Sequence, residues 1–273
     1  MKKIGLKKWL FLILFFLFFY YSVFFEPKNI KVEKLTIFIK ELPKSFEGTK
    51  IVQISDLHSL WFGNREKKLL KIVESLNPDF VFLTGDYVDP LTKLTDKNLN
   101  SVKKFWEILG EKYSGKIFAV FGNHDTKFVQ AEILKTKIIV LENKSRKIFK
   151  GKDFIYLVGV SDPRTGQDSI SKALEDVKED RPKILLAHAP EIIEKIKNLN
   201  FDLVLVGDTH GGQVNLPFLK NFHLTKLGRK YPKGFFKLKN TILYVNRGIG
   251  TTFFPIRFYC QPEITLIELK TSD

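Results

Sequence analysis

The chain has 273 residues, 44% of them hydrophobic, which is enough to bury one large core. Its 45 lysines and arginines exceed its 30 aspartates and glutamates, so the formal net charge is +15 and the expected partners are anionic. The basic residues are scattered and no nucleic-acid-binding signature is present, which excludes nucleic acid and leaves a lipid surface or a phosphorylated substrate. A single cysteine, Cys260, excludes an internal disulfide. Composition does not indicate an oligomeric state.

The N-terminus is predicted to be a membrane anchor over residues 1–25. Residues 9–25 carry no charge and no polar stripe, and a helix of this length rises about 25 Å, close to the hydrocarbon thickness of a bilayer. The first alanine is Ala119, so the small residues of a signal-peptidase site are missing and the anchor is expected to stay uncleaved in the cell membrane. Lysines flank the run on both sides, which leaves open the side of the membrane on which the rest of the chain lies.

Two further segments follow the anchor. Residues 26–48 are interpreted as a juxtamembrane segment in which residues 30–39 alternate and predict an edge strand. Residues 49–273 show no internal boundary or repeat and are predicted to be one catalytic domain.

The first half of that domain repeats a unit of strand, polar loop and helix. Apolar runs predict strands, and each ends in polar side chains where parallel strands usually present ligands. The predicted strands are 51–54, 79–84 and 116–121, with helices at 64–76 and 96–110 between them.

The second half has more strand character. Strands are predicted at 154–160, 183–187 and 202–206, with a helix at 169–177 and a short helix from Pro190. Residues 237–245 and 258–269 alternate enough to predict antiparallel hairpins around Asn240 and around Gln261-Pro262.

The loops after these strands contain an unusual set of polar residues. Carboxylate, amide and imidazole groups suit Mn²⁺, Fe or Zn²⁺ and differ from the thiolate sets of structural zinc. One ion cannot use so many groups, whereas two ions about 3.5 to 4 Å apart can share a carboxylate. The candidate metal ligands are Asp56, His58, Asp86, Asn123, His188, Asp208 and His210.

Their order, Asp-x-His, Gly-Asp, Gly-Asn-His-Asp, His and Gly-x-Thr-His, resembles the calcineurin-like dinuclear metallophosphoesterases. The resemblance implies an α/β (α+β) fold, a four-layer αββα sandwich of two mixed β-sheets with outer helices. It assigns one metal to Asp56, His58, Asp86 and His210. It assigns the second to Asp86, Asn123 and His188, with Asp86 bridging.

The chain departs from the family at one second-metal position. The first histidine of the last block is replaced here by Asp208, and a carboxylate adds negative charge and favours harder ions. Two divalent cations are therefore expected, Mn²⁺ foremost, with Fe, Zn²⁺ and Mg²⁺ as alternatives.

The resemblance also implies a mechanism, attack on phosphorus by a hydroxide shared between the two metals. It places His124 over the leaving-group oxygen as proton donor, with Asp125 orienting its ring. Arg247 is a candidate phosphate clamp, although an ordinary surface arginine fits its position as well.

Gly-Gly-Gln after His210 and the tail around Asn246-Arg247-Gly248 resemble a membrane-associated branch of the family, which includes UDP-2,3-diacylglucosamine pyrophosphatase-type enzymes of lipid A biosynthesis. We therefore expect a membrane-anchored phosphohydrolase that cleaves a phosphodiester or pyrophosphate bond in a lipid-linked substrate such as UDP-2,3-diacylglucosamine. Trp61, Phe62 and residues 216–236 are candidate lipid contacts, with ordinary packing as the alternative. A non-catalytic module that binds phosphorylated lipid or a protein, or a protein phosphatase, stays open as a rival function.

Overall fold

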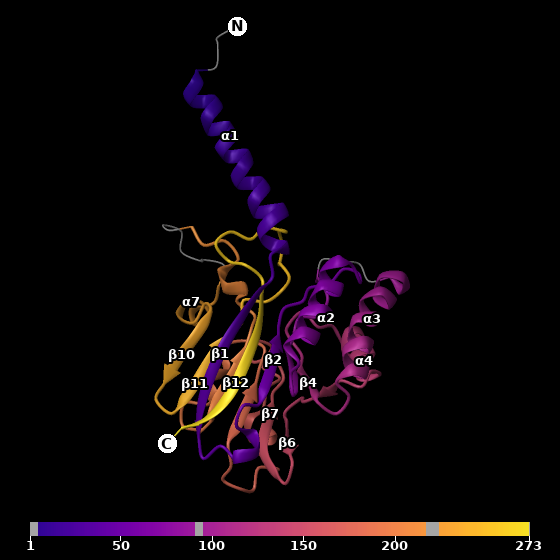
Figure 1. The fold of residues 1–273 in the computed structure, drawn as a ribbon, viewed down its shortest axis with the longest axis vertical. Coiled ribbons are helices and arrows are strands. Elements are labelled where there is room, and N and C mark those ends of the chain that lie inside the picture. Colours follow the sequence, from indigo (N-terminus) through magenta and orange to yellow (C-terminus); the bar gives the residue numbers. More distant parts are fainter. Residues whose placement is uncertain (1–4, 91–94, 217–223, 273) are drawn as a thin grey trace.

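A computed structural model describes residues 5–90, 95–216 and 224–272. Its first element, α1 (Leu6–Tyr20), projects from the rest of the molecule and buries none of its residues (Figure 1). The helix continues through a π-helical turn at Tyr21–Phe25 and a 3₁₀ turn at Glu26–Lys28. Within the described residues, this stretch, Leu6–Lys28, is the one that is long and apolar enough to cross a membrane.

The remainder is built on two six-stranded mixed sheets. The predicted edge strand is confirmed, because β1 lies at the end of the first sheet and pairs in parallel with β12, the last strand of the chain. In order across the first sheet, the strands are β1 (Lys31–Lys40), β12 (Glu263–Ser272), β2 (Lys50–Ile54), β3 (Phe80–Thr84), β4 (Ile117–Val120) and β5 (Ile139–Val140). Across the second they are β10 (Gly234–Leu238), β11 (Thr241–Val245), β9 (Leu203–Val206), β8 (Lys183–Leu186), β7 (Asp153–Gly159) and β6 (Lys144–Lys150).

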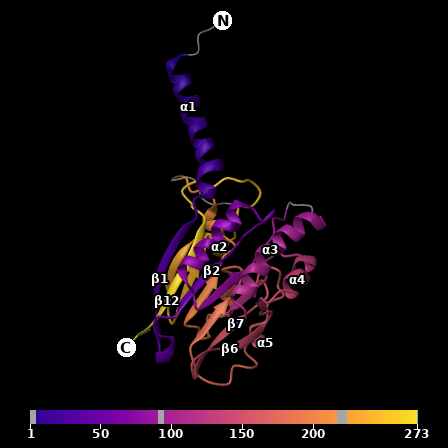
Figure 2. The ribbon, with the colours of Figure 1, turned by 45° about the vertical axis from the view of Figure 1, so that its right-hand side comes forward.

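The two sheets face each other and helices cover their outer faces (Figures 1 and 2). Buried side chains of both sheets, among them Phe82, Phe118 and Leu205, form one cluster between them. Each such side chain stabilises the fold by about 1.5–3 kcal/mol relative to exposure. A second cluster joins the first sheet to α2 (Asn64–Leu76), α3 (Asp96–Lys112) and α4 (Lys127–Leu134), and a third joins the second sheet to α5 (Ile170–Ala173), α6 (Ile192–Lys195) and α7 (Lys226–Lys230). The expected αββα sandwich is therefore confirmed.

The structure confirms some of the predicted hairpins, helices and strands and contradicts others. The hairpin around Asn240 is confirmed as β10 and β11, which are antiparallel. The prediction of a hairpin around Gln261-Pro262 is wrong. Residues 251–260 form a loop bound to the base of α1, and β12 begins only at Glu263. The helix expected over residues 169–177 is a single turn, α5. β6 was not predicted, because its lysine-rich sequence is typical of an edge strand rather than a buried one.

Candidate metal centre

The candidate ligands leave the carboxyl ends of parallel strands in both sheets. In the first sheet, β2, β3 and β4 run parallel and lead to Asp56, Asp86 and Asn123. In the second sheet, β8 and β9 run parallel and lead to His188 and Asp208. Because parallel strands end at the same edge, each sheet brings its own polar residues together.

Polar contacts between the sheets hold these two edges against each other. The backbone N–H of Asp208 donates to Oδ1 of Asp56 at 3.1 Å, so the last ligand block is bonded directly to the first. Behind them, the fully buried Gln53 donates from Nε2 to the carbonyl oxygen of Val206 at 3.1 Å and to Oγ1 of Thr84 at 3.2 Å. The site thus lies where the two sheets meet.

Most of the candidate ligands have an uncommon backbone conformation. A non-glycine residue with positive φ costs about 1–3 kcal/mol and persists only where its surroundings enforce it, as in active sites. Clustering of such residues marks this edge as a functional site rather than a set of ordinary turns. The φ angles are 48° at Asp56, 39° at His58, 57° at Asp86, 67° at Asp208 and 49° at His210.

Two glycines allow the ligand loops to approach one another closely. A Cβ atom on Gly207 would lie 1.9 Å from Oγ of Ser55 and 2.3 Å from Oδ2 of Asp56. A Cβ atom on Gly122 would lie 2.3 Å from Oδ1 of Asp86. Any side chain at either position would push a candidate ligand out of place, which explains the Gly-x and Gly-Asn patterns in physical terms.

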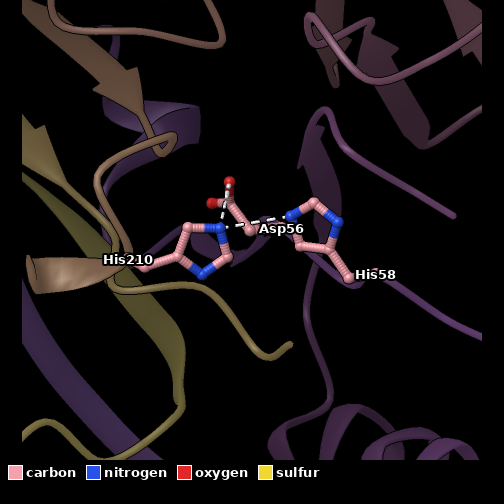
Figure 3. A group of neighbouring side chains, drawn as sticks. All are labelled: Asp56, His58 and His210. Carbon is pink, nitrogen blue, oxygen red and sulfur yellow. Dashed lines mark hydrogen bonds and ion pairs between the residues drawn. The ribbon is translucent and has the colours of Figure 1, made fainter. Parts of the chain in front are cut away.

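The first group of ligands consists of Asp56, His58 and His210, all buried (Figure 3). Nε2 of His58 and Nε2 of His210 face each other at 3.1 Å, and Oδ1 of Asp56 lies 3.6 Å from Nε2 of His210. Two imidazole nitrogens bound at right angles to one ion, each about 2.1 Å away, would be about 3.0 Å apart, so this spacing fits a shared cation.

Burial also sets the protonation of this first group. It lowers the pKa of His58 to about 4 and that of His210 well below its usual value. Both rings are therefore neutral near pH 7, the form in which imidazole binds metals.

The second group consists of Asp56, Asp86 and His188. Nδ1 of His188 lies 2.7 Å from the carbonyl oxygen of Thr84. Such a contact directs the other ring nitrogen to a metal. Nε2 of His188 has no hydrogen-bond partner, although it is buried, and neither has Oδ1 of Asn123. Buried polar atoms normally have partners, so these two atoms are available to bind a cation, and Nε2 of His188 already lies 3.3 Å from Oδ2 of Asp86.

Asp86 lies between the two groups. Its Oδ2 is 3.5 Å from Nε2 of His58 and 3.3 Å from Nε2 of His188, and its Oδ1 accepts the backbone N–H of His124 at 3.0 Å. Burial alone would raise the pKa of Asp86, but the neighbouring His188 and His58 outweigh it and hold that pKa below its usual range. This position fits the bridging role expected of Asp86, and Asp56, which belongs to both groups, is also placed to be shared.

The site buries more carboxylate than its histidines can balance. The pKa of Asp56 is raised to about 7, mainly by burial, with the nearby charges of Asp86 and Asp208 adding to the rise and His188 opposing it. Burial likewise raises the pKa of Asp208. Divalent cations would relieve this repulsion, and the residues present therefore fit a two-metal site.

Asp208 has a partner that the sequence analysis missed. Its Oδ1 lies 3.6 Å from Nε2 of His188, which places it at the second group as expected, and the same oxygen also pairs closely with the Arg164 guanidinium. Arg164 belongs to the loop after β7, 44 residues away in sequence. Its positive charge offsets the carboxylate that this chain has in place of the family histidine. In the sequence, the extra negative charge of Asp208 suggests a basic partner, but it does not indicate which lysine or arginine that partner is.

The structure places His124 beside the metal ligands. Its ring lies edge-on to that of His58, with centroids 5.8 Å apart, and it is half-buried. Asp125 has other partners than the ring it was expected to orient: its carboxylate accepts the backbone N–H groups of Gly122, Asp86 and Tyr87 at 2.8–2.9 Å. These bonds fix the loop that presents His124 and Asp86 to the site.

The three expected substrate contacts have different surroundings. Arg247 pairs with Glu33 and Glu263, and a phosphate contact would require those ion pairs to open. Phe62 packs against the core of the first sheet, and Nζ of Lys104 lies 5.6 Å from its ring centroid. Trp61 instead is exposed and lines a cleft of 560 Å³ that reaches His58. Of residues 216–236, residues 217–223 lie outside the described part of the chain.

A two-sheet sandwich with carboxylates, histidines and an asparagine grouped at its edge defines a metal-dependent phosphoesterase. The family model for calcineurin-like phosphoesterases matches residues 49–212, and the chain belongs to that family.

Its relatives cover nearly the whole chain. It is 30% identical to the metallophosphoesterase YkuE of Bacillus subtilis (strain 168), over 93% of this chain and 90% of that protein. It is 31% identical to the phosphodiesterase YaeI of Escherichia coli (strain K12), over 81% and 82% of the two chains. It is 28% identical to the UDP-2,3-diacylglucosamine pyrophosphatase LpxG of Chlamydia muridarum (strain MoPn / Nigg), over 89% and 90%.

Proposed function

We propose that this protein is a membrane-anchored phosphohydrolase that uses two divalent cations, Mn²⁺ foremost, to cleave a phosphodiester or pyrophosphate bond in a lipid-linked substrate. The observation that carries the proposal is the 560 Å³ cleft, because its lining includes His58 of the metal centre together with Val23 and Pro27 at the base of α1. One cleft thus connects the reactive site to the segment proposed to lie in the membrane. Phe253 and Phe254 contribute apolar surface to it that acyl chains can contact.

The residues divide the chemical work. The residues that would hold the cations are Asp56, His58, Asp86, Asn123, His188, Asp208 and His210. Bound there, the cations would lower the pKa of a shared water and neutralise charge on the phosphoryl oxygens. His124 stands beside His58 on the exposed side and would give its proton to the departing oxygen.

The substrate class follows from the cleft and the relatives taken together. LpxG is named a UDP-2,3-diacylglucosamine pyrophosphatase and YaeI a phosphodiesterase, and both act on phosphoric diester or anhydride bonds by those names. A substrate like UDP-2,3-diacylglucosamine would place its acyl chains toward α1 and its phosphates at the metals. Such a nucleotide-linked substrate requires the catalytic domain to face the cytoplasm, where nucleotide sugars are made.

The test uses the full chain in sealed vesicles loaded with Mn²⁺. We expect hydrolysis of UDP-2,3-diacylglucosamine embedded in the bilayer to be faster than hydrolysis of a soluble phosphodiester, because α1 concentrates the site at the surface. Protease accessibility on the same vesicles reports the side on which the domain lies. Equal rates on both substrates would remove the case for a lipid, and no hydrolysis of either would favour the non-catalytic module.

The metal preference is expected to depend on Asp208. In Asp208→His the second group loses a carboxylate, and preference should shift from Mn²⁺ or Mg²⁺ toward Zn²⁺, because imidazole suits a softer ion. Matched titrations of metal-stripped protein with each ion measure this preference. Arg164→Gln is the control, because it removes the paired charge and keeps Asp208. An unchanged order of affinities in Asp208→His would mean that Asp208 does not bind metal.

A further inference from the structure

The loop at residues 251–260 carries aromatic side chains that are exposed rather than packed in the domain core. Phe253 is 73% exposed, Phe254 70% and Tyr259 79%, and Trp61 across the cleft is 60% exposed. We call these four side chains the aromatic rim. Single exposed aromatic residues are common, but Trp61, Phe253 and Phe254 line one cleft and Tyr259 lies on the same loop, so together they form a surface that water solvates poorly.

The loop is bound to the base of α1. The ring of Phe258 lies 4.7 Å from that of Phe18, and the backbone N–H of Arg257 donates to the carbonyl oxygen of Ser22 at 2.9 Å. The buried carboxylate of Glu26 accepts the backbone N–H groups of Tyr259 and Cys260. Figure 1 shows this yellow loop around the lower end of α1. These contacts fix the position of the loop, with Phe253, Phe254 and Tyr259, relative to the base of α1.

The loop is also rigid and continuous with the metal centre. Arg257 is fully buried and donates from its guanidinium to the carbonyl oxygens of Gly248, Gly250 and Cys260. The backbone N–H of Gly250 donates to the carbonyl oxygen of Asp56 at 2.7 Å. The rim is thus held at a fixed distance from the reactive site.

The length of α1 sets the depth of the rim. A bilayer core of about 30 Å needs about 20 helical residues. α1 and the π-helical turn after it supply 15 and 5 residues, but Lys7 and Lys8 lie at the start, so the uncharged stretch at 9–25 is needed to its end at Phe25 to approach the core thickness. Phe258 packs against Phe18 and Tyr21, which lie before that end. A bilayer that covers the whole stretch must therefore extend to the level of the loop.

We infer that the aromatic rim is a second membrane-contacting surface, which inserts into the bilayer interface and seats the mouth of the cleft on the lipid. This inference rests on the proposed membrane anchoring of α1. Trp61 and Tyr259 favour the interface because their rings are apolar and their polar atoms stay hydrated, and Phe253 and Phe254 add apolar surface beside them. Lys28 lines the same cleft, and Nζ of Lys233 lies 3.5 Å from the carbonyl oxygen of Tyr259. These two lysines can bind anionic lipid headgroups.

Depth-dependent fluorescence quenching tests the inference on the full chain. Single cysteines replace Phe253, Tyr259 or Phe15 of α1 and carry an environment-sensitive dye, in vesicles that contain a lipid with a quencher on its acyl chain. Cys260 is 1% exposed and does not compete for the dye. Phe149→Cys is the matched control, because Phe149 is 60% exposed on β6, which lies away from α1 (Figure 1). Thermal unfolding of each labelled protein checks that it is folded.

We expect dye at positions 253 and 259 to lose emission nearly as strongly as at position 15, and dye at position 149 to be unaffected. Quenching at 15 with none at 253 and 259 would overturn the rim while leaving the anchor. No quenching at any position would overturn both. Hydrolysis of a soluble phosphodiester by the same samples reports the catalytic part of the proposed function separately, since it needs no bilayer.

Discussion

Asp86→Ala is expected to abolish metal loading and turnover together, with a rate loss of at least about 10³-fold, because bound metals supply several kcal/mol of transition-state stabilisation. The carboxylate of Asp86 lies within 3.5 Å of a ring nitrogen of both His58 and His188. Its removal therefore withdraws a ligand from the second group and a carboxylate that lies beside the first. Elemental analysis of the purified protein measures metal content, and hydrolysis of a phosphodiester measures rate.

Asp202→Ala is the matched control for this prediction. Asp202 is also an aspartate of the sandwich, but it lies at the start of β9, where its carboxylate accepts the backbone N–H of Lys183 at 2.8 Å. Its loss should lower stability and leave metal content unchanged. Asp86→Asn preserves the shape of the side chain and guards against simple misfolding. Full metal content and activity in both Asp86 variants would contradict the bridging assignment.

His124→Ala is expected to retain both metals and to lose rate by roughly 10²- to 10⁴-fold, the range typical of a lost general acid. The imidazole is half-buried beside His58, and the link between this residue and Asp86 is its backbone N–H, which alanine keeps. Metal binding and proton transfer should therefore separate in this variant. Metal content and hydrolysis rates, measured side by side, check the separation.

The leaving group gives a sharper readout of the same variant. A p-nitrophenolate leaves without a proton, whereas an alkoxide needs one, so the rate loss in His124→Ala should be small for a p-nitrophenyl diester and large for an alkyl diester. Equal losses on the two substrates would mean that His124 acts on something other than the leaving oxygen. Loss of metal would instead make it a ligand.

The buried strands and the candidate ligands were predictable from local patterns, whereas the four-layer sandwich followed from the family resemblance. A strand buried on both faces, such as β3 or β9, reads as an unbroken apolar run, and the polar residue after it marks the carboxyl end. Parallel pairing then brings those ends together without further information. The lysine-rich β6 was not predicted because its sequence carries little buried-strand periodicity, and the helix at 169–177 was predicted too long, since α5 is a single turn.

Contacts between distant segments were not predictable in this way. Arg164 offered no motif, and only the folded chain brings its guanidinium to Asp208. Arg247 was expected at a phosphate, yet its guanidinium pairs with Glu33, 214 residues away, and with Glu263. An arginine pairs with whichever carboxylates the tertiary structure brings near it, and a sequence pattern does not contain that information.

By itself the sequence determined the family, the order of the ligands and the apolar N-terminal helix, because each can be recognised from short stretches of consecutive residues and their periodicity. Only the tertiary structure decided the point along that helix at which the domain contacts it, and which side chains surround the cleft. Phe253, Phe254 and Tyr259 follow the last ligand block by more than forty residues and look like ordinary loop residues. They gather at the base of α1 because buried Arg257 and Glu26 bind their loop there through backbone carbonyl and N–H groups, which every residue has and no sequence pattern distinguishes.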